Sequence, residues 1–243
     1  MKTKDKIVLT SLELFNERGE RNVSTNHIAS HMGMSPGNLY YHFRNKSDII
    51  YEIFKNYELM VDTYLHVPSD RAIHIHDLIA YLDAVFNGLW AYRFLHRDLE
   101  HLLASDERLR EEYRQFTLRC LAGIQSIILA MEESQIYRPM AEQQRKSKAL
   151  NTWLIVTNWM TYLKTIHSKE DEQEALTRKS IQHGVYLVLD YVMPYLYDDK
   201  RELALELQEK YRFEGIAPKP DMRPARSLSE NSDRREGNQA WPQ

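Results

Sequence analysis

One short segment of the chain brings an unusual set of polar side chains together. Residues 34–46 read MSPGNLYYHFRNK, so a serine, a proline and a glycine precede an asparagine, two tyrosines and a histidine. Amide, hydroxyl and imidazole groups all donate hydrogen bonds, and phosphate oxygens accept them. An asparagine amide can also pair with N6 and N7 of adenine. The chemistry on offer is therefore binding to nucleic acid.

The start of this segment has the signals of a short helix. Ser35 suits the N-cap, Pro36 suits the first helical position because its missing N–H would be unpaired there anyway, and Gly37 lets another backbone approach closely. Leu39 and Phe43 lie four residues apart and face inward on such a helix. Aromatic runs more often pack in a core, but here the inward positions are already filled. The residues left for the outer faces are Gly37, Asn38, Tyr40, Tyr41 and His42.

Two further helices are expected before this one, over about 4–18 and 25–32. Ser24 caps the second of them and Gly33 ends it. Two short helices joined by a tight glycine-containing turn and stacked on a third form a helix-turn-helix, whose second helix enters a major groove of DNA. Lys46, at the start of the next expected helix, adds a charge that can neutralise a phosphate.

The same residues carry a family resemblance. The segments SLELFNERG at 11–19 and VSTNHIASHMGMSPGNLYYHFRNKSDII at 23–50 resemble the DNA-binding domain of the TetR family of bacterial transcriptional repressors, with its LF-x-x-x-G, IA-x-x-x-G-[VM]-S and LY-x-HF-x-x-K patterns. The resemblance implies a three-helix head, double-stranded DNA with a palindromic operator as partner, and a larger helical body that binds an effector and dimerises. By resemblance, the positions that usually touch DNA are Thr25, Gly37, Asn38, Tyr40, Tyr41, His42 and Lys46.

The rest of the chain also predicts an all-α fold. Its apolar residues recur every three or four positions, and no hairpin signal such as Asn-Gly separates them. We expect a helix-turn-helix domain over 1–50, a connecting helix to about 65, a helical effector-binding and dimerisation domain over 66–212, and a disordered tail over 213–243. The body helices are predicted at about 71–91, 93–104, 107–134, 141–167, 171–196 and 198–212.

Charge and cysteine content narrow the setting. The net charge is only -3, although residues 1–46 hold seven basic against four acidic residues. No apolar run reaches the roughly 18 residues of a membrane span, and the first residues lack a secretory signal. The single cysteine, Cys120, excludes an internal disulfide and suits a reducing compartment. These features predict a cytoplasmic protein that does not enter a membrane.

The body contains many aromatic residues that could line a pocket. A ligand pocket has mostly apolar walls with a few placed polar groups, and this composition fits a largely hydrophobic effector such as an acyl chain or an aromatic molecule. The alternative is that these residues form plain core. The candidates are Phe86, Trp90, Tyr92, Phe94, Tyr113, Phe116, Trp153, Asn158, Trp159 and Tyr162.

Two helices are expected to form a four-helix dimer interface. The stretch WLIVTNWMTYL at 153–163 is apolar on nearly every face, so such a helix must be buried on both sides. In the next helix a glycine among valines indicates close packing. The alternative is a monomeric bundle core. The residues assigned to the interface are Ile181, Gly184, Val185, Val188 and Val192.

Metal, cofactor and enzyme chemistry are not expected. His74 and His76 lie two residues apart, so on a helix they face different directions. His96 and Glu100 lack an evident third ligand, although zinc sites use three or four. No set of nucleophile, base and orienting residue is recognisable, and no glycine-rich phosphate loop is present. An alternative that keeps the DNA-binding head is a structural or division-related DNA binder whose body meets another protein. Activation instead of repression also stays open.

Overall fold

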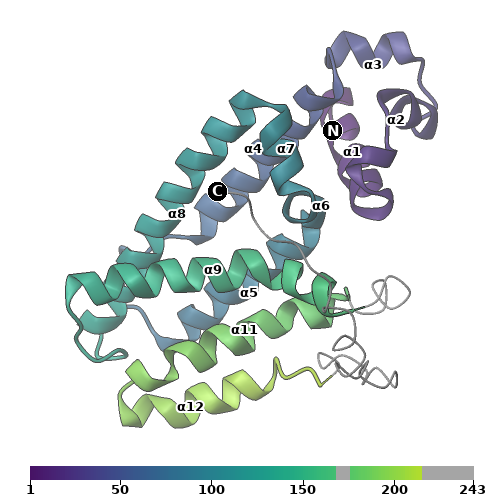
Figure 1. Cartoon of the computed structure of the whole chain (residues 1–243). Coiled ribbons are helices and arrows are strands. Elements are labelled where there is room, and N and C mark those ends of the chain that lie inside the picture. Colours follow the sequence, from purple (N-terminus) through teal and green to yellow (C-terminus); the bar gives the residue numbers. More distant parts are fainter. Residues whose placement is uncertain (168–175, 215–243) are drawn as a thin grey trace, which may run out of the picture.

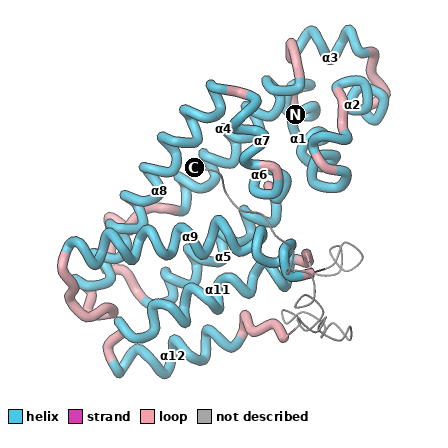
Figure 2. Tube along the Cα trace, viewed as in Figure 1, coloured by secondary structure: helices cyan, strands magenta, loops and turns pink. Residues whose placement is uncertain are grey.

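The computed structural model describes residues 1–167 and 176–214, and these ranges are helical apart from turns, loops and a single antiparallel bridge between Tyr137 and Leu196 (Figures 1 and 2). The predicted all-α class is thereby confirmed. The predicted tail lies outside the described residues from 215 onward, as do the first residues of the helix predicted from 171.

A small head of three helices stands at one end of the molecule (Figure 1). It contains α1 (Thr3–Arg18), a 3₁₀ turn (Glu20–Asn22), α2 (Thr25–His31) and α3 (Pro36–His42). Phe15 and Leu39 are fully buried in its core, and Phe43 is 4% exposed. Because the inward face of α3 is filled by Leu39 and Phe43, the other residues of this helix are free to face outward, as predicted.

The helix α4 (Lys46–Tyr64) leads from the head into the body and packs on α1, α5 and α8. The body then follows in chain order, with α9, α11 and α12 lying roughly alongside one another and α8 beside α4 (Figure 1). Its helices are α5 (Ile75–Ala91), α6 (Arg93–Arg97), α7 (Leu99–Ser105), α8 (Glu107–Glu133), α9 (Glu142–Ile166), α11 (Arg178–Val192) and α12 (Asp198–Glu209), with a 3₁₀ turn over Met193–Tyr195.

Three predicted helices differ from the structure: the one expected over 171–196 is α11, which begins at Arg178 and ends at Val192, where the 3₁₀ turn follows. The other two differ for local reasons. The fifth helix begins at Ile75 and not near 71, because the Asp77 carboxylate accepts a hydrogen bond from the His74 backbone N–H at 2.7 Å and pairs with Arg71. That arrangement caps the helix at His74. The helix expected over 93–104 is two helices, α6 and α7, which meet at Asp98.

The head does not sit on the body through α4 alone. The rings of Phe15 in α1 and Phe94 in α6 are 5.1 Å apart and share one buried cluster. The Asn16 amide donates to the Ala91 carbonyl at 2.7 Å, and the Arg97 guanidinium donates to the Phe15 carbonyl, also at 2.7 Å. The core of the head is therefore continuous with α6, which contacts α1 directly.

The residues expected to form a dimer interface lie inside a single chain. Ile181, Val185 and Val188 are at most 1% exposed, and Val192 is 7% exposed. Gly184 is buried against Phe86, so closely that a Cβ atom there would lie 2.1 Å from the Phe86 ring. This placement corrects the expectation, because α11 uses its apolar face to pack on α5 and α9 within the protomer.

A different helix face carries uncovered apolar side chains. Leu150, Leu154 and Tyr162, all on α9, are 46%, 47% and 46% exposed. They follow one another at spacings of four and eight residues and so share one face of the helix. Within the described ranges, no helix combines the length and the hydropathy needed to cross a bilayer.

Candidate DNA-binding face and effector cavity

The outer face of α3 presents the side chains that the sequence assigned to DNA. Tyr41 is 84% exposed and Tyr40 is 48% exposed, while Gly37 and Asn38 are also exposed. His42 is half-buried and lies edge-on to Tyr41, with ring centroids 5.1 Å apart. These side chains therefore stand where a duplex could reach them.

Local capping fixes the direction of this helix. The Ser35 hydroxyl accepts a hydrogen bond from the Asn38 backbone N–H at 3.2 Å, and Pro36 fills the first turn. In the preceding turn Gly33 adopts a φ of 63°, which L side chains rarely adopt. Gly37 has only the Ser35 hydroxyl oxygen within 4 Å of where a Cβ would be. The helix begins in open space, as close approach to a ligand requires.

A groove beside α3 is lined by one predicted residue, Thr25, and by two arginines that were not predicted from the sequence. The Thr25 hydroxyl lies at one wall of the groove, 2.9 Å from the Tyr40 hydroxyl. Arg21 and Arg44 line the same groove, are exposed, and form no ion pair within the described part of the chain. Free guanidinium groups suit phosphate oxygens. Arg44 could have been predicted as a phosphate contact, because it directly follows the inward-facing Phe43 and therefore points away from the core.

Lys46 is placed differently from the expectation. Its ammonium lies 2.6 Å from the Glu20 carboxylate and donates to the carbonyls of Glu20 and Val23 at 3.0 and 3.1 Å. A lysine has three donors, so all of them have partners inside the head. Because the Glu20 side chain is only 5% exposed, we correct the assignment of Lys46 from phosphate contact to holding the head together.

Replacing Arg44 should affect DNA binding, whereas replacing Lys46 should affect the stability of the head. Arg44→Ala is expected to weaken binding to every DNA sequence and to lower the slope of log affinity against log salt by about one per subunit. Lys46→Met should instead lower the free energy of unfolding of the head by about 2 kcal/mol, because a buried carboxylate loses its partner. Salt titrations of DNA binding and urea unfolding measure the two effects. A reduced salt slope for a fully folded Lys46→Met variant would contradict this assignment.

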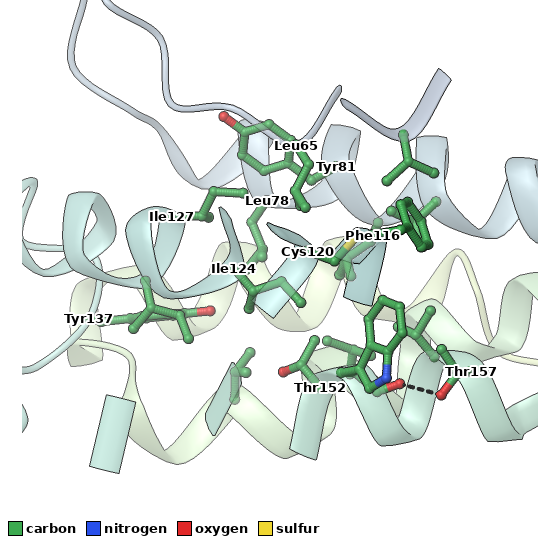
Figure 3. Close-up of a pocket in the computed structure, with 18 of the residues that line it drawn as sticks. Leu65, Leu78, Tyr81, Phe116, Cys120, Ile124, Ile127, Tyr137, Thr152 and Thr157 are labelled. Atoms are coloured by element: carbon green, nitrogen blue, oxygen red, sulfur yellow. Dashed lines mark hydrogen bonds between the residues drawn. The ribbon is translucent and has the colours of Figure 1, made fainter. Parts of the chain in front are cut away.

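The body contains a partly open cavity between α4, α5, α8, α9 and α11 (Figure 3). About 90 Å³ of it is open to the centres of water-sized spheres, and roughly 10–15 Å³ on this measure holds one water molecule. Its lining contains no charged side chain among the described residues. The lining residues are Tyr57, Val61, Leu65, Leu78, Tyr81, Leu82, Val85, Phe116, Cys120, Ile124, Ile127, Ile128, Tyr137, Thr152, Trp153, Val156, Thr157, Val188 and Val192.

The ionisable groups that face the cavity are held neutral. Burial raises the pKa of the Cys120 thiol to about 12 and raises the pKa of Tyr57 well above its ordinary value. The Tyr57 hydroxyl is 3.1 Å from Nε2 of His96, which is buried behind it. Burial lowers the pKa of His96 to about 4. The cavity is thus an apolar chamber without charge at neutral pH.

Two of the ten predicted pocket residues, Phe116 and Trp153, line this cavity. Phe86 and Phe94 are fully buried core residues, and the Trp159 indole donates to the Ser180 carbonyl at 2.8 Å. Asn158 and Tyr162 are exposed on α9. The remaining three also lie outside the lining: Trp90 under the Arg93 guanidinium, Tyr92 against Tyr57, and Tyr113 in a separate space of about 10 Å³.

The histidines of the described ranges form no group with other ligand residues that could hold a metal ion. His96 is hydrogen-bonded to Tyr57 and faces the core. His101 is 3.9 Å from the Glu20 carboxylate, on the side of the head.

Comparison with known proteins gives a consistent result along the chain. A family model described as "Bacterial regulatory proteins, tetR family" matches residues 7–53, and one described as "Bacterial transcriptional repressor" matches residues 56–204. An HTH-type transcriptional regulator of Staphylococcus aureus (strain USA300) is 34% identical over 59 residues, which are 24% of this chain. The match covers 32% of that regulator, so the chain spans about a third of the length of the curated relatives it matches.

Solved structures extend the similarity to the body. A TetR-family transcriptional regulator from Marinobacter aquaeolei VT8 has a TM-score of 0.80 and 54% sequence identity, covering 88% of this chain and all of that one. SmeT, the repressor of the Stenotrophomonas maltophilia multidrug efflux pump SmeDEF, shares the fold with a TM-score of 0.56 and 17% identity, covering 90% of this chain and 98% of that one. With a matching head, a matching body and an exposed recognition helix, the chain belongs to the TetR family of bacterial transcriptional regulators, which are not enzymes.

Proposed function

We propose that the protein is a homodimeric repressor that a small, largely hydrophobic effector releases from a palindromic operator. The exposed face of α3 carries the first half of this proposal, since Tyr40, Tyr41 and Asn38 point outward from a helix whose apolar side is fully used. Recognition helices of this kind read base edges in the major groove. We also propose that the protein is located in the cytoplasm, because it would act on DNA and its one cysteine, Cys120, is a buried free thiol.

The cavity supports the second half. Tyr57 and Val61 of its wall belong to α4, the helix that starts in the head at Lys46, and Leu65 follows directly after this helix. An effector that pushes on this wall would move α4 and so change the distance between two heads. A coupling of 1–3 kcal/mol changes DNA occupancy about 5- to 150-fold. SmeT has been solved in complex with triclosan, which is a precedent for a small aromatic ligand in this fold.

The main alternative is a structural or division-related DNA binder whose body meets another protein. A solid body would favour it, and the apolar cavity in the body counts against it. Purified protein should prefer DNA from its own promoter over random DNA at physiological salt by 10³-fold or more. Equal affinity for both would remove the repressor proposal.

Dimerisation is proposed through the exposed apolar face of α9, defined by Leu150, Leu154 and Tyr162. Exposed apolar patches of this kind mark contact surfaces. We expect Leu154→Glu to weaken dimerisation at least 100-fold, because two buried apolar contacts are lost and two charges are placed in the interface. Sedimentation velocity at micromolar concentration would then show a monomer.

The matched control is Leu205→Glu on α12, where the leucine is 51% exposed but stands on another element. It should remain dimeric. If Leu205→Glu dissociates the protein and Leu154→Glu does not, the interface has been placed on the wrong helix.

A further inference from the structure

Two hydroxyl groups in the cavity lining form no hydrogen bond with other described residues. They belong to Tyr137, which follows α8, and to Thr152 on α9. Tyr137 is only 3% exposed as a whole residue, and its side chain faces the cavity. Figure 3 shows the Tyr137 oxygen directed into the cavity, on the side where the Thr152 hydroxyl and Ile124 also lie.

The other hydroxyl groups of the lining already have partners. Tyr81 donates to the His66 carbonyl at 2.7 Å, and Thr157 donates to the Trp153 carbonyl at 2.8 Å. Tyr57 lies against His96. The half-buried Trp153 indole N–H is one more group without a partner among the described residues, but it can only donate. Tyr137 and Thr152 can each donate and accept.

A hydroxyl that faces an apolar cavity without a protein partner can form a hydrogen bond with a ligand, and ligand sites commonly use a few such groups to orient what they bind. A charged group on the ligand would have a different effect from a neutral polar group. Burying an unpaired ion in an apolar chamber is far more unfavourable than burying a neutral group, and this lining has no residue of opposite charge to offset it. The chamber thus selects against carboxylates, for which its apolar and aromatic lining offers no compensating charge.

We propose that the effector is an uncharged, mainly aromatic or aliphatic molecule with one hydroxyl or carbonyl group, which Tyr137 and Thr152 bind at one end of the cavity. This inference rests on the proposed effector-binding function and narrows it. Free fatty acids are excluded as effectors, whereas phenols, alcohols, ketones and esters are admitted. Tyr137 is then a specificity-determining residue.

Three naphthalenes with the same ring system test this inference on the full chain without DNA. Calorimetric titration should rank 2-naphthol above 2-methylnaphthalene by about 2- to 10-fold, the range for one hydrogen bond. 2-Naphthoate, which is an anion at pH 7.5, should bind more than 100-fold more weakly than 2-naphthol. Tyr137→Phe should abolish the advantage of 2-naphthol and leave the affinity for 2-methylnaphthalene unchanged, and Thr152→Val should reduce that advantage.

Tyr81→Phe is the matched control, because it also removes a cavity-wall hydroxyl, but one that is bonded to the His66 carbonyl. It should keep the preference for 2-naphthol. Tight binding of 2-naphthoate, or an unchanged preference in Tyr137→Phe, would overturn the inference while leaving effector binding intact. Failure of all three compounds to bind would overturn the inference together with the effector part of the proposed function, but not DNA binding.

Discussion

Replacing Asn38 by alanine is expected to weaken binding to the operator by about 30-fold or more, while binding to random DNA changes less than about twofold. Asn38 is exposed in the first turn of α3, and its backbone N–H is already satisfied by Ser35. The side-chain amide is therefore available to a base edge. A good bidentate contact contributes about 1–3 kcal/mol to discrimination, and a dimer makes it twice. Fluorescence anisotropy with operator and random duplexes at one salt concentration measures both affinities.

Asn26→Ala provides the control for this variant. Asn26 is also an exposed asparagine of the head, but it stands on α2, the helix that crosses the DNA backbone in this motif. Its loss should affect operator and random DNA by the same factor. If Asn38→Ala also weakened both to the same extent, Asn38 would be a phosphate contact and another residue of α3 would read the bases.

Phe86→Ala is expected to lower the free energy of unfolding by about 3–5 kcal/mol, the range for losing a buried phenylalanine. Phe86 is fully buried in the body core, and its ring lies against Gly184 of α11. The same contact predicts that Gly184→Ala changes the free energy of unfolding in opposite directions in the native protein and in the Phe86→Ala variant. Gly184→Ala should destabilise the native protein by about 2 kcal/mol, because its new Cβ would lie 2.1 Å from Cε1 of Phe86 and overpacking costs about 1–3 kcal/mol.

In the Phe86→Ala background, Gly184→Ala should become stabilising by up to about 1 kcal/mol. The space vacated by the ring accepts the methyl group, and alanine is the better helix former. Urea unfolding at a fixed protein concentration gives all four values of this double-mutant cycle. Gly37→Ala, whose added Cβ meets only the Ser35 hydroxyl oxygen at 4.0 Å, should not destabilise either background. Additive effects of the two core substitutions would show that Gly184 is not held by this contact.

The recognition helix could be predicted from sequence because its signals are local. Ser35, Pro36 and the spacing of Leu39 and Phe43 are enough to place the helix and to choose its inward face. The structure agrees at each of these positions. The family resemblance added the larger body, and the comparisons bear it out over residues 56–204.

The roles of the body residues were harder to predict, because the spacing of apolar residues along a helix does not show whether its apolar face packs against the same chain or against a partner. Val185 and Val188 have the pattern of an interface, but the same pattern arises when α5 and α9 cover them within one chain. Lys46 had the charge expected of a phosphate contact, yet its partner Glu20 lies 26 residues earlier in the chain. Such long-range pairing leaves no local signal.

The cavity was missed for a related reason. It is the space left where side chains of five helices meet, so its lining depends on the packing of the whole body. The aromatic residues singled out from sequence went mostly to filled core or to the surface, as Phe86 and Tyr162 illustrate. Tyr137, outside any helix, carried no periodic signal at all.

Selection of DNA from a random duplex library by the chain of residues 1–243 would measure its sequence preference and its half-site spacing together. We predict enrichment of a palindrome whose two half-sites lie one helical turn, about 34–36 Å, or a multiple of it apart. Tyr41→Ala, which removes the most exposed aromatic side chain of α3, should lower that enrichment. A library that emerges without a shared sequence, or with one asymmetric half-site only, would contradict a dimeric, sequence-reading repressor.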